Sequence, residues 1–146
     1  MPSNTTLYDS DFFAWAYEQA ALLRAGRLTE ADIENIAEEI ESMGRSEKRE
    51  LVSRLTVLFV HLLKWRHQPG LQGGSWRRTI EQQRLHLTEH LADNPSLRAK
   101  LGEAIASAYG HARIDAENET GLIRSSFPPS CPFSFDDAMN PDFWPE

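Results

Sequence analysis

The chain has 146 residues and a formal net charge of −7 at pH 7; 40% of its residues are hydrophobic, 25% charged and 10% aromatic. This composition is typical of a soluble globular protein with apolar material for one core, so we expect a single domain over residues 1–146. The one cysteine, Cys131, excludes an internal disulfide framework and a four-cysteine zinc site. The sequence has no visible export signal and no apolar run long enough for a membrane span, which favours a cytoplasmic protein without a membrane partner.

Charge is distributed unevenly along the chain. Residues 1–44 carry two Arg against nine acidic residues, residues 45–100 carry eleven Lys and Arg against five, and residues 101–146 carry two against eight. The basic middle is a candidate surface for nucleic acid or another anion. The favoured interpretation is that the acidic segments fold against it, because isolated nucleic-acid binders usually have a basic overall composition.

Apolar residues recur at helical spacing near the start of the chain. Their pattern predicts a first helix over residues 9–25, preceded by carboxylates that can cap it and terminated by Gly26. A second helix is expected from Thr29, with Asp32 at the capping-box position. The apolar side of this second helix consists of Ile33, Ile36, Ala37, Ile40 and Met43.

Leucines at intervals of three and four residues predict a third helix from Ser46 onward, the clearest element of the sequence. Gly44 is expected to separate it from the second helix. The apolar phase nevertheless continues through this glycine, so one long helix is the alternative. Residues 68–74 have the proline and glycine content of a loop.

Two further helices and an irregular tail complete the chain. Ser75 is the expected cap of a fourth helix that ends near Asp93, and Asn94 followed by Pro95 is typical of the start of a fifth. Prolines and aromatic residues predict a tail over about residues 121–146 that packs on the helices, with one short turn over residues 134–139. The predicted fold class is all-α, a bundle of four to five helices over about residues 9–118 with this tail packed on it.

One histidine pattern resembles a zinc-protease motif. His86, Glu89 and His90 match the order H-x-x-E-H, in which two histidines four residues apart can hold one ion. The apolar stripe of the same helix leaves His86 and Glu89 at its flank, and the sequence offers no evident third ligand. A solvated helix face is therefore favoured, and we expect no metal and no cofactor.

His61 lies inside the most apolar stretch of the chain. Its imidazole needs polar partners if buried, and Glu38 or Glu39 is the expected source. The favoured interpretation is a core histidine that fixes the packing of the helices. The alternative is an enzyme with a polar pocket that supplies a base, an orienting carboxylate and an anion clamp, made by Glu38, Glu39, His61, Lys64 and Arg84.

A glycine-rich loop over residues 70–74 leads into the predicted fourth helix. Basic and aromatic side chains flank this loop, an arrangement that can bind a phosphate or stack on single-stranded nucleic acid. The phosphate-binding loop of nucleotide hydrolases is absent, and packing of the tryptophans is the favoured interpretation. The candidate anion or nucleic-acid residues are Lys64, Arg66, Gly73, Gly74, Arg77 and Arg78, next to Trp65 and Trp76.

Several short motifs, taken in order, resemble the bacterial family called domain of unknown function 29. They are YDSDFFAW at residues 8–15, AEEIESMG at 37–44, HLLKW at 61–65, QP at 68–69, SW at 75–76, TI at 79–80, QR at 83–84, PSL at 95–97, ET at 119–120, FP at 127–128 and CP at 131–132. The resemblance covers nearly the whole chain. It implies a small α-helical bacterial protein and carries over no catalytic residue.

These observations favour a non-enzymatic, macromolecule-binding or regulatory module. Its expected partner is a protein, bound through a surface that includes the proline and aromatic tail or the basic loop. An enzyme with the polar pocket described above and a nucleic-acid-binding protein are the alternatives, the latter less favoured than a protein binder.

Overall fold

The structure, a computed structural model, describes residues 4–146, with side chains from residue 7 onward. Within this range the chain is all-α and has no strand, which confirms the predicted fold class. Its elements are α1 (Asn4–Ser10), α2 (Phe12–Arg24), α3 (Ile33–His67), η1 (Pro69–Leu71), α4 (Gly74–Asp93), η2 (Pro95–Lys100), α5 (Leu101–Thr120), η3 (Arg124–Ser126) and α6 (Phe135–Met139), where η denotes a 3-10 turn. The residues cluster into two compact units, Met1–Ser46 and Glu47–Glu146. The single domain expected from the sequence stays a prediction.

The predicted first helix is interrupted near its start. Asp11 separates α1 from α2, and its carboxylate accepts a hydrogen bond of 3.0 Å from the backbone N–H of Ala14. An aspartate that caps a helix in this way satisfies one of the backbone donors that the first turn leaves free. Gly26 follows α2 with φ at 71°, a conformation that glycine adopts without strain, so the predicted C-terminal stop is correct.

The predicted break at Gly44 is wrong, and the alternative of one long helix is confirmed. Helix α3 runs without interruption from Ile33 to His67. One glycine costs a helix only about 1 kcal/mol relative to alanine, so it cannot stop a segment whose apolar face is otherwise continuous. The start of this helix also differs from the prediction, because residues 28–31 form turns and bends instead of helix.

Partly buried polar contacts join the start of α3 to α2 in the first unit. Asp32 accepts a hydrogen bond of 3.1 Å from the indole N–H of Trp15, and its backbone N–H donates to the side-chain oxygen of Gln19 at 2.7 Å. Trp15 and Gln19 are the two buried residues in the described part of this unit. Asp32 therefore stabilises the packing of two helices and does not form the capping box with Thr29.

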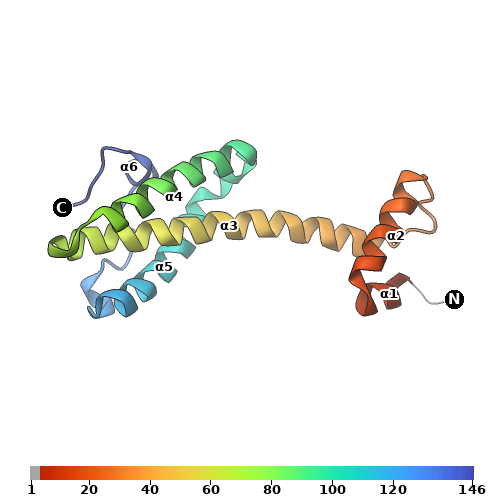
Figure 1. Cartoon of the computed structure of the whole chain (residues 1–146), viewed down its shortest axis with the longest axis horizontal. Coiled ribbons are helices and arrows are strands. Elements are labelled where there is room, and N and C mark those ends of the chain that lie inside the picture. Colours follow the sequence, from red (N-terminus) through yellow and green to blue (C-terminus); the bar gives the residue numbers. More distant parts are fainter. Residues whose placement is uncertain (1–3) are drawn as a thin grey trace. The chain divides into compact units, whose positions relative to one another are not determined.

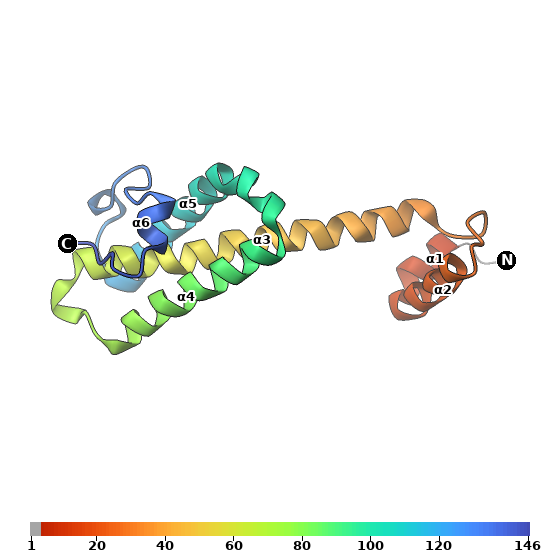
Figure 2. The same ribbon diagram turned by 90° about the horizontal axis from the view of Figure 1, so that it is seen from above.

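The core of the second unit is built from three helices, and α4 and α5 flank α3 in both views (Figures 1 and 2). On α4, Ile80, Leu87 and Leu91 are buried and Trp76 is partly buried against the core. Helix α5 begins six residues after the predicted Pro95, because a 3-10 turn comes first. Small side chains let α5 approach its neighbours closely, and its buried positions are Ala104, Ala108, Tyr109, Ala112 and Ala116.

The C-terminal tail packs on this core as predicted. Phe127 and Phe133 are buried, and Ser134 caps the short helix α6 by accepting from the backbone N–H of Asp137. The hydroxyl of Tyr109 donates a hydrogen bond of 2.7 Å to the carbonyl oxygen of Pro128. Across residues 4–146, no helix combines the length and the apolar character needed to cross a membrane.

Candidate functional site

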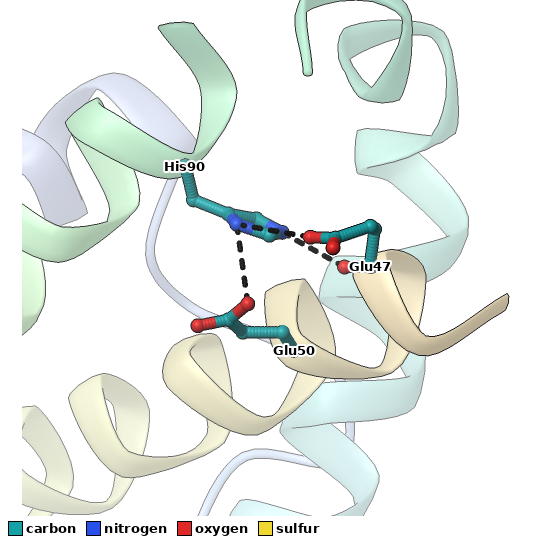
Figure 3. Close-up of side chains that lie close together, drawn as sticks. All are labelled: Glu47, Glu50 and His90. Carbon is teal, nitrogen blue, oxygen red and sulfur yellow. Dashed lines mark hydrogen bonds and ion pairs between the residues drawn. The ribbon is translucent and has the colours of Figure 1, made fainter. Parts of the chain in front are cut away.

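The imidazole of His90, on α4, points at two glutamates on α3 (Figure 3). Its Nε2 lies 2.8 Å from the backbone carbonyl oxygen of Glu47. A carbonyl oxygen only accepts, so Nε2 carries a hydrogen and donates it. The other ring nitrogen, Nδ1, faces Oε2 of Glu50 at 3.4 Å and Oε2 of Glu47 at 3.7 Å.

A hollow of about 350 Å³ lies over this cluster. The His90 side chain is only 8% exposed, whereas both glutamates reach solvent. Oε1 of Glu50 accepts from Arg54, whose Nη2 lies 3.0 Å away, and this contact leaves Oε2 turned toward the imidazole. The remaining lining consists of His86, Glu89, Asp93 and Asn94. Polar groups therefore converge here from two helices.

The polar pocket predicted around His61 is not assembled by hydrogen bonds or ion pairs. Glu38 pairs with Arg45 at 2.7 Å, and the carboxylate of Glu39 accepts from the hydroxyl of Tyr8. That hydrogen bond raises the pKa of Tyr8 to about 12. No such contact in the described part of the chain joins either glutamate to His61, so the expected partners of this histidine are wrong.

His61 is half-buried and bonds within its own helix. Its Nδ1 lies 2.8 Å from the carbonyl oxygen of Val57, one turn earlier. Burial lowers the pKa of His61, which favours the neutral ring. Lys64, the predicted anion clamp, instead forms an ion pair of 3.4 Å with Glu119. His61 therefore bonds within its own helix, and the neighbouring lysine has a carboxylate partner; a role of His61 in helix packing stays a prediction.

Arg84, the remaining residue of the predicted pocket, is buried against the tail. It donates from Nε to the carbonyl oxygen of Ala138 at 2.7 Å and from Nη2 to that of Phe143 at 2.8 Å. Its guanidinium carbon lies 5.1 Å from the ring centroid of Trp144. Burial lowers the pKa of this arginine. The side chain therefore holds the tail in place.

The aromatic rings beside the predicted basic loop are covered by cations of the same chain. Lys64 lies 5.0 Å from the ring centroid of Trp76, and Arg77 lies 4.4 Å from that of Trp144. The rings of Trp144 and Trp65 are themselves in contact, with centroids 4.7 Å apart. Stacking of this kind occupies ring faces that a nucleic-acid base would need.

The other predicted anion-binding residues lie on the surface around the start of α4. Gly73 is the N-cap of this helix and Gly74 its first residue. Arg78 is exposed, and Arg66 lines a shallow hollow of about 450 Å³ together with Trp65 and Arg77. Nucleic-acid binding by this region stays a prediction.

An apolar groove in the first unit runs between α2 and the start of α3. Its volume is about 410 Å³. Ile40 and Met43, on the α3 side, are 59% and 63% exposed. The lining consists of Phe12, Trp15, Ala16, Gln19, Ala20, Leu23, Ile36, Glu39, Ile40 and Met43. The sequence predicted the apolar side of this helix but not that it would remain open.

Most of the chain matches one known protein family. The family model for domain of unknown function DUF29 matches residues 7–144. The chain belongs to the DUF29 family. The resemblance noted in the sequence is thus confirmed, whereas no curated protein and no solved structure matches the chain. DUF29 is a domain of unknown function, so membership in it assigns no activity.

In this DUF29 chain, sequence reasoning missed the burial of His90. The histidine follows Leu87 by three residues and precedes Leu91, so it shares the buried face of α4. That spacing was the sign in the sequence that His90 is buried. Its carboxylate partners lie about 40 residues earlier, on α3, and no local pattern connects them. His86 and Glu89 line the same hollow.

Proposed function

We propose that this DUF29 protein is a protein-binding module that holds a basic amphipathic helix of its partner in the groove between α2 and the start of α3. The observation that carries the proposal is the open apolar stripe of α3. Ile33, Ile40 and Met43 recur at helical spacing and are all exposed. A stripe of this kind is what one helix presents to another.

The small core of the first unit supports the need for a partner. Its buried side chains are Trp15 and Gln19, within the described residues. Eight of the twelve large hydrophobic residues that are exposed in residues 4–146 lie in this unit. Units of about 40 residues rarely bury enough surface to be stable without added support such as association. An occupant of the groove would supply the missing apolar burial.

A buried donor in the groove also lacks an acceptor. Gln19 lines the groove, and its side-chain Nε2 is buried with no hydrogen-bond partner among the described residues. Buried polar groups are nearly always paired in stable proteins. The unpaired amide costs the first unit part of its own stability.

Charge favours a basic partner over a second copy of the chain. The exposed Glu34 flanks the stripe on α3, and the first unit carries nine acidic residues against three Arg, of which Arg45 pairs with Glu38 and Glu41. Two copies that met through this surface would bring like charges together, which disfavours association. A helix with lysine or arginine beside its apolar face would instead be attracted.

The test is a titration of the full chain with a labelled helical peptide made of leucine and lysine, followed by fluorescence anisotropy. We expect Ile40→Asp to weaken binding by about tenfold or more, because it removes apolar contact. The negative charge of the introduced aspartate would attract a basic peptide. A loss of peptide binding would therefore not be explained by electrostatic repulsion. The matched control is Leu85→Asp on α4, where the leucine is 58% exposed and lies outside the groove.

Two results would overturn the proposal. Equal loss of binding in Ile40→Asp and Leu85→Asp would place the peptide elsewhere. A dimer of the unmodified chain in light scattering that Ile40→Asp converts to a monomer would assign the groove to a second copy. A matching peptide with glutamate in place of lysine should not bind.

A further inference from the structure

We propose that His90, Glu47 and Glu50 form a binding site for one divalent transition-metal ion, with Zn²⁺ as the best match. The site lies wholly in the second unit and is independent of the groove. One ligand atom from each of the three residues lies within 4.8 Å of the others (Figure 3). An ion there would link α3 to α4.

The direction of the imidazole is the first argument. Because Nε2 donates to the carbonyl oxygen of Glu47, the neutral ring has its lone pair on Nδ1. That lone pair points at two carboxylate oxygens, which also carry only lone pairs. A cation between them converts this repulsive arrangement into three favourable contacts. Metal-binding histidines nearly always donate their second nitrogen to a carbonyl or carboxylate, as His90 does here.

The distances are the second argument. Nδ1 lies 3.4 Å from Glu50 and 3.7 Å from Glu47, longer than the roughly 2.7–2.9 Å of a charge-assisted hydrogen bond. Ligands at about 2.0–2.2 Å from a tetrahedral Zn²⁺ lie about 3.4 Å from one another. The separations thus leave room for an ion with little movement of the side chains.

The chemistry of the donors selects the class of ion. Imidazole with two carboxylates suits Zn²⁺ and its transition-metal neighbours, whereas Mg²⁺ and Ca²⁺ prefer oxygen ligands alone. Arg54 holds Oε1 of Glu50 and so orients Oε2 toward the site, while its charge offsets one carboxylate. Three protein ligands leave a fourth position open toward the hollow, where His86 and Asp93 lie.

The test uses the full chain, prepared without a histidine tag and stripped of metal, and titrates it with ZnCl₂ by calorimetry and thermal unfolding. We expect one Zn²⁺ per chain, a higher Tm with the metal, and no effect of MgCl₂. Glu50→Gln should weaken Zn²⁺ binding by at least about tenfold and abolish the rise in Tm. The glutamine side chain keeps an oxygen atom that can accept a hydrogen bond from Arg54, so we expect this variant to fold.

The matched control is Glu89→Gln, which alters the same hollow without removing one of the three ligands. It should change Zn²⁺ affinity less than about threefold. Co²⁺ bound to the unmodified chain should show the visible absorption of a four-coordinate ion, and Glu50→Gln should lose it. No Zn²⁺ binding, or equal binding by Glu50→Gln, would overturn the proposal.

Discussion

Arg84 donates a hydrogen bond of 2.7 Å to the carbonyl oxygen of Ala138, which lies 54 residues later in the chain. This bond fixes the end of α6 to the middle of α4. A second bond, to Phe143, extends the attachment along the tail. The guanidinium is planar and its N–H donors point in fixed directions. Hydrogen bonds from it to two backbone carbonyl groups therefore constrain the position of the tail.

Replacing this arginine should release the tail. In Arg84→Met the carbonyl groups of Ala138 and Phe143 lose their donor, and we expect the free energy of unfolding to fall by about 2–4 kcal/mol in urea titrations. Amide exchange over residues 135–144 should rise in parallel. Arg78→Met, at an exposed position of the same helix, is the control and should change stability by less than about 0.5 kcal/mol. Unchanged exchange in the tail would contradict this role of Arg84.

Substitution by alanine should have opposite effects on stability at two of the glycines. Gly44 is helical, and a Cβ there would meet open space, so Gly44→Ala should stabilise the chain by about 0.5–1 kcal/mol. Gly121 ends α5 with φ at 77°, where an L side chain is strained, so Gly121→Ala should destabilise it by about 1 kcal/mol. Chemical denaturation of both variants measures the difference. Destabilisation by Gly44→Ala would contradict the continuity of α3.

His61 should make stability depend on pH. Burial lowers its pKa below the unfolded value, so the unfolded chain binds the proton more tightly. The contribution of His61 is therefore fully present above the unfolded pKa of about 6.5 and is lost as the pH falls toward the folded pKa. His67 is shifted in the same direction. His61→Gln should flatten the fall in Tm between about pH 7.5 and 5, whereas the exposed His111→Gln should not.

Cys131 should react slowly with thiol reagents. Burial raises the pKa of its thiol, and the sulfur donates to the carbonyl oxygen of Phe133 at 3.4 Å. The thiolate is the reactive form, so at about pH 8 the folded chain should react more slowly than the urea-unfolded chain. Colorimetric thiol titration measures both rates. Equal rates would mean that the tail around this cysteine does not pack as described.

The helical parts of the fold follow from sequence because periodicity reports the buried face directly. The leucines of α3 are buried as their spacing predicts. Gly44 was misleading because a lone glycine lowers helix propensity without providing a stop. The 3-10 turn after Asn94 was also missed, since Pro95 suits the first turn of either helix type.

The candidate sites depend on contacts between distant segments, which no local pattern contains. The sequence singled out His90, but its partners come from α3 and were not paired with it. Glu39 was assigned to His61 and instead accepts from Tyr8. Arg84 shares the helical spacing of the buried residues of α4. This spacing indicated that its side chain is buried and not free to bind an anion.

The four tryptophans are divided between the units, Trp15 in the first and Trp65, Trp76 and Trp144 in the second. Trp15 lines the apolar groove and donates its indole N–H to Asp32, so an occupant would change the surroundings of that ring directly. The chain therefore carries its own optical reporter for each half. Subtracting the intrinsic emission of Trp15→Phe from that of the unmodified chain would isolate the signal of the groove, with no added dye.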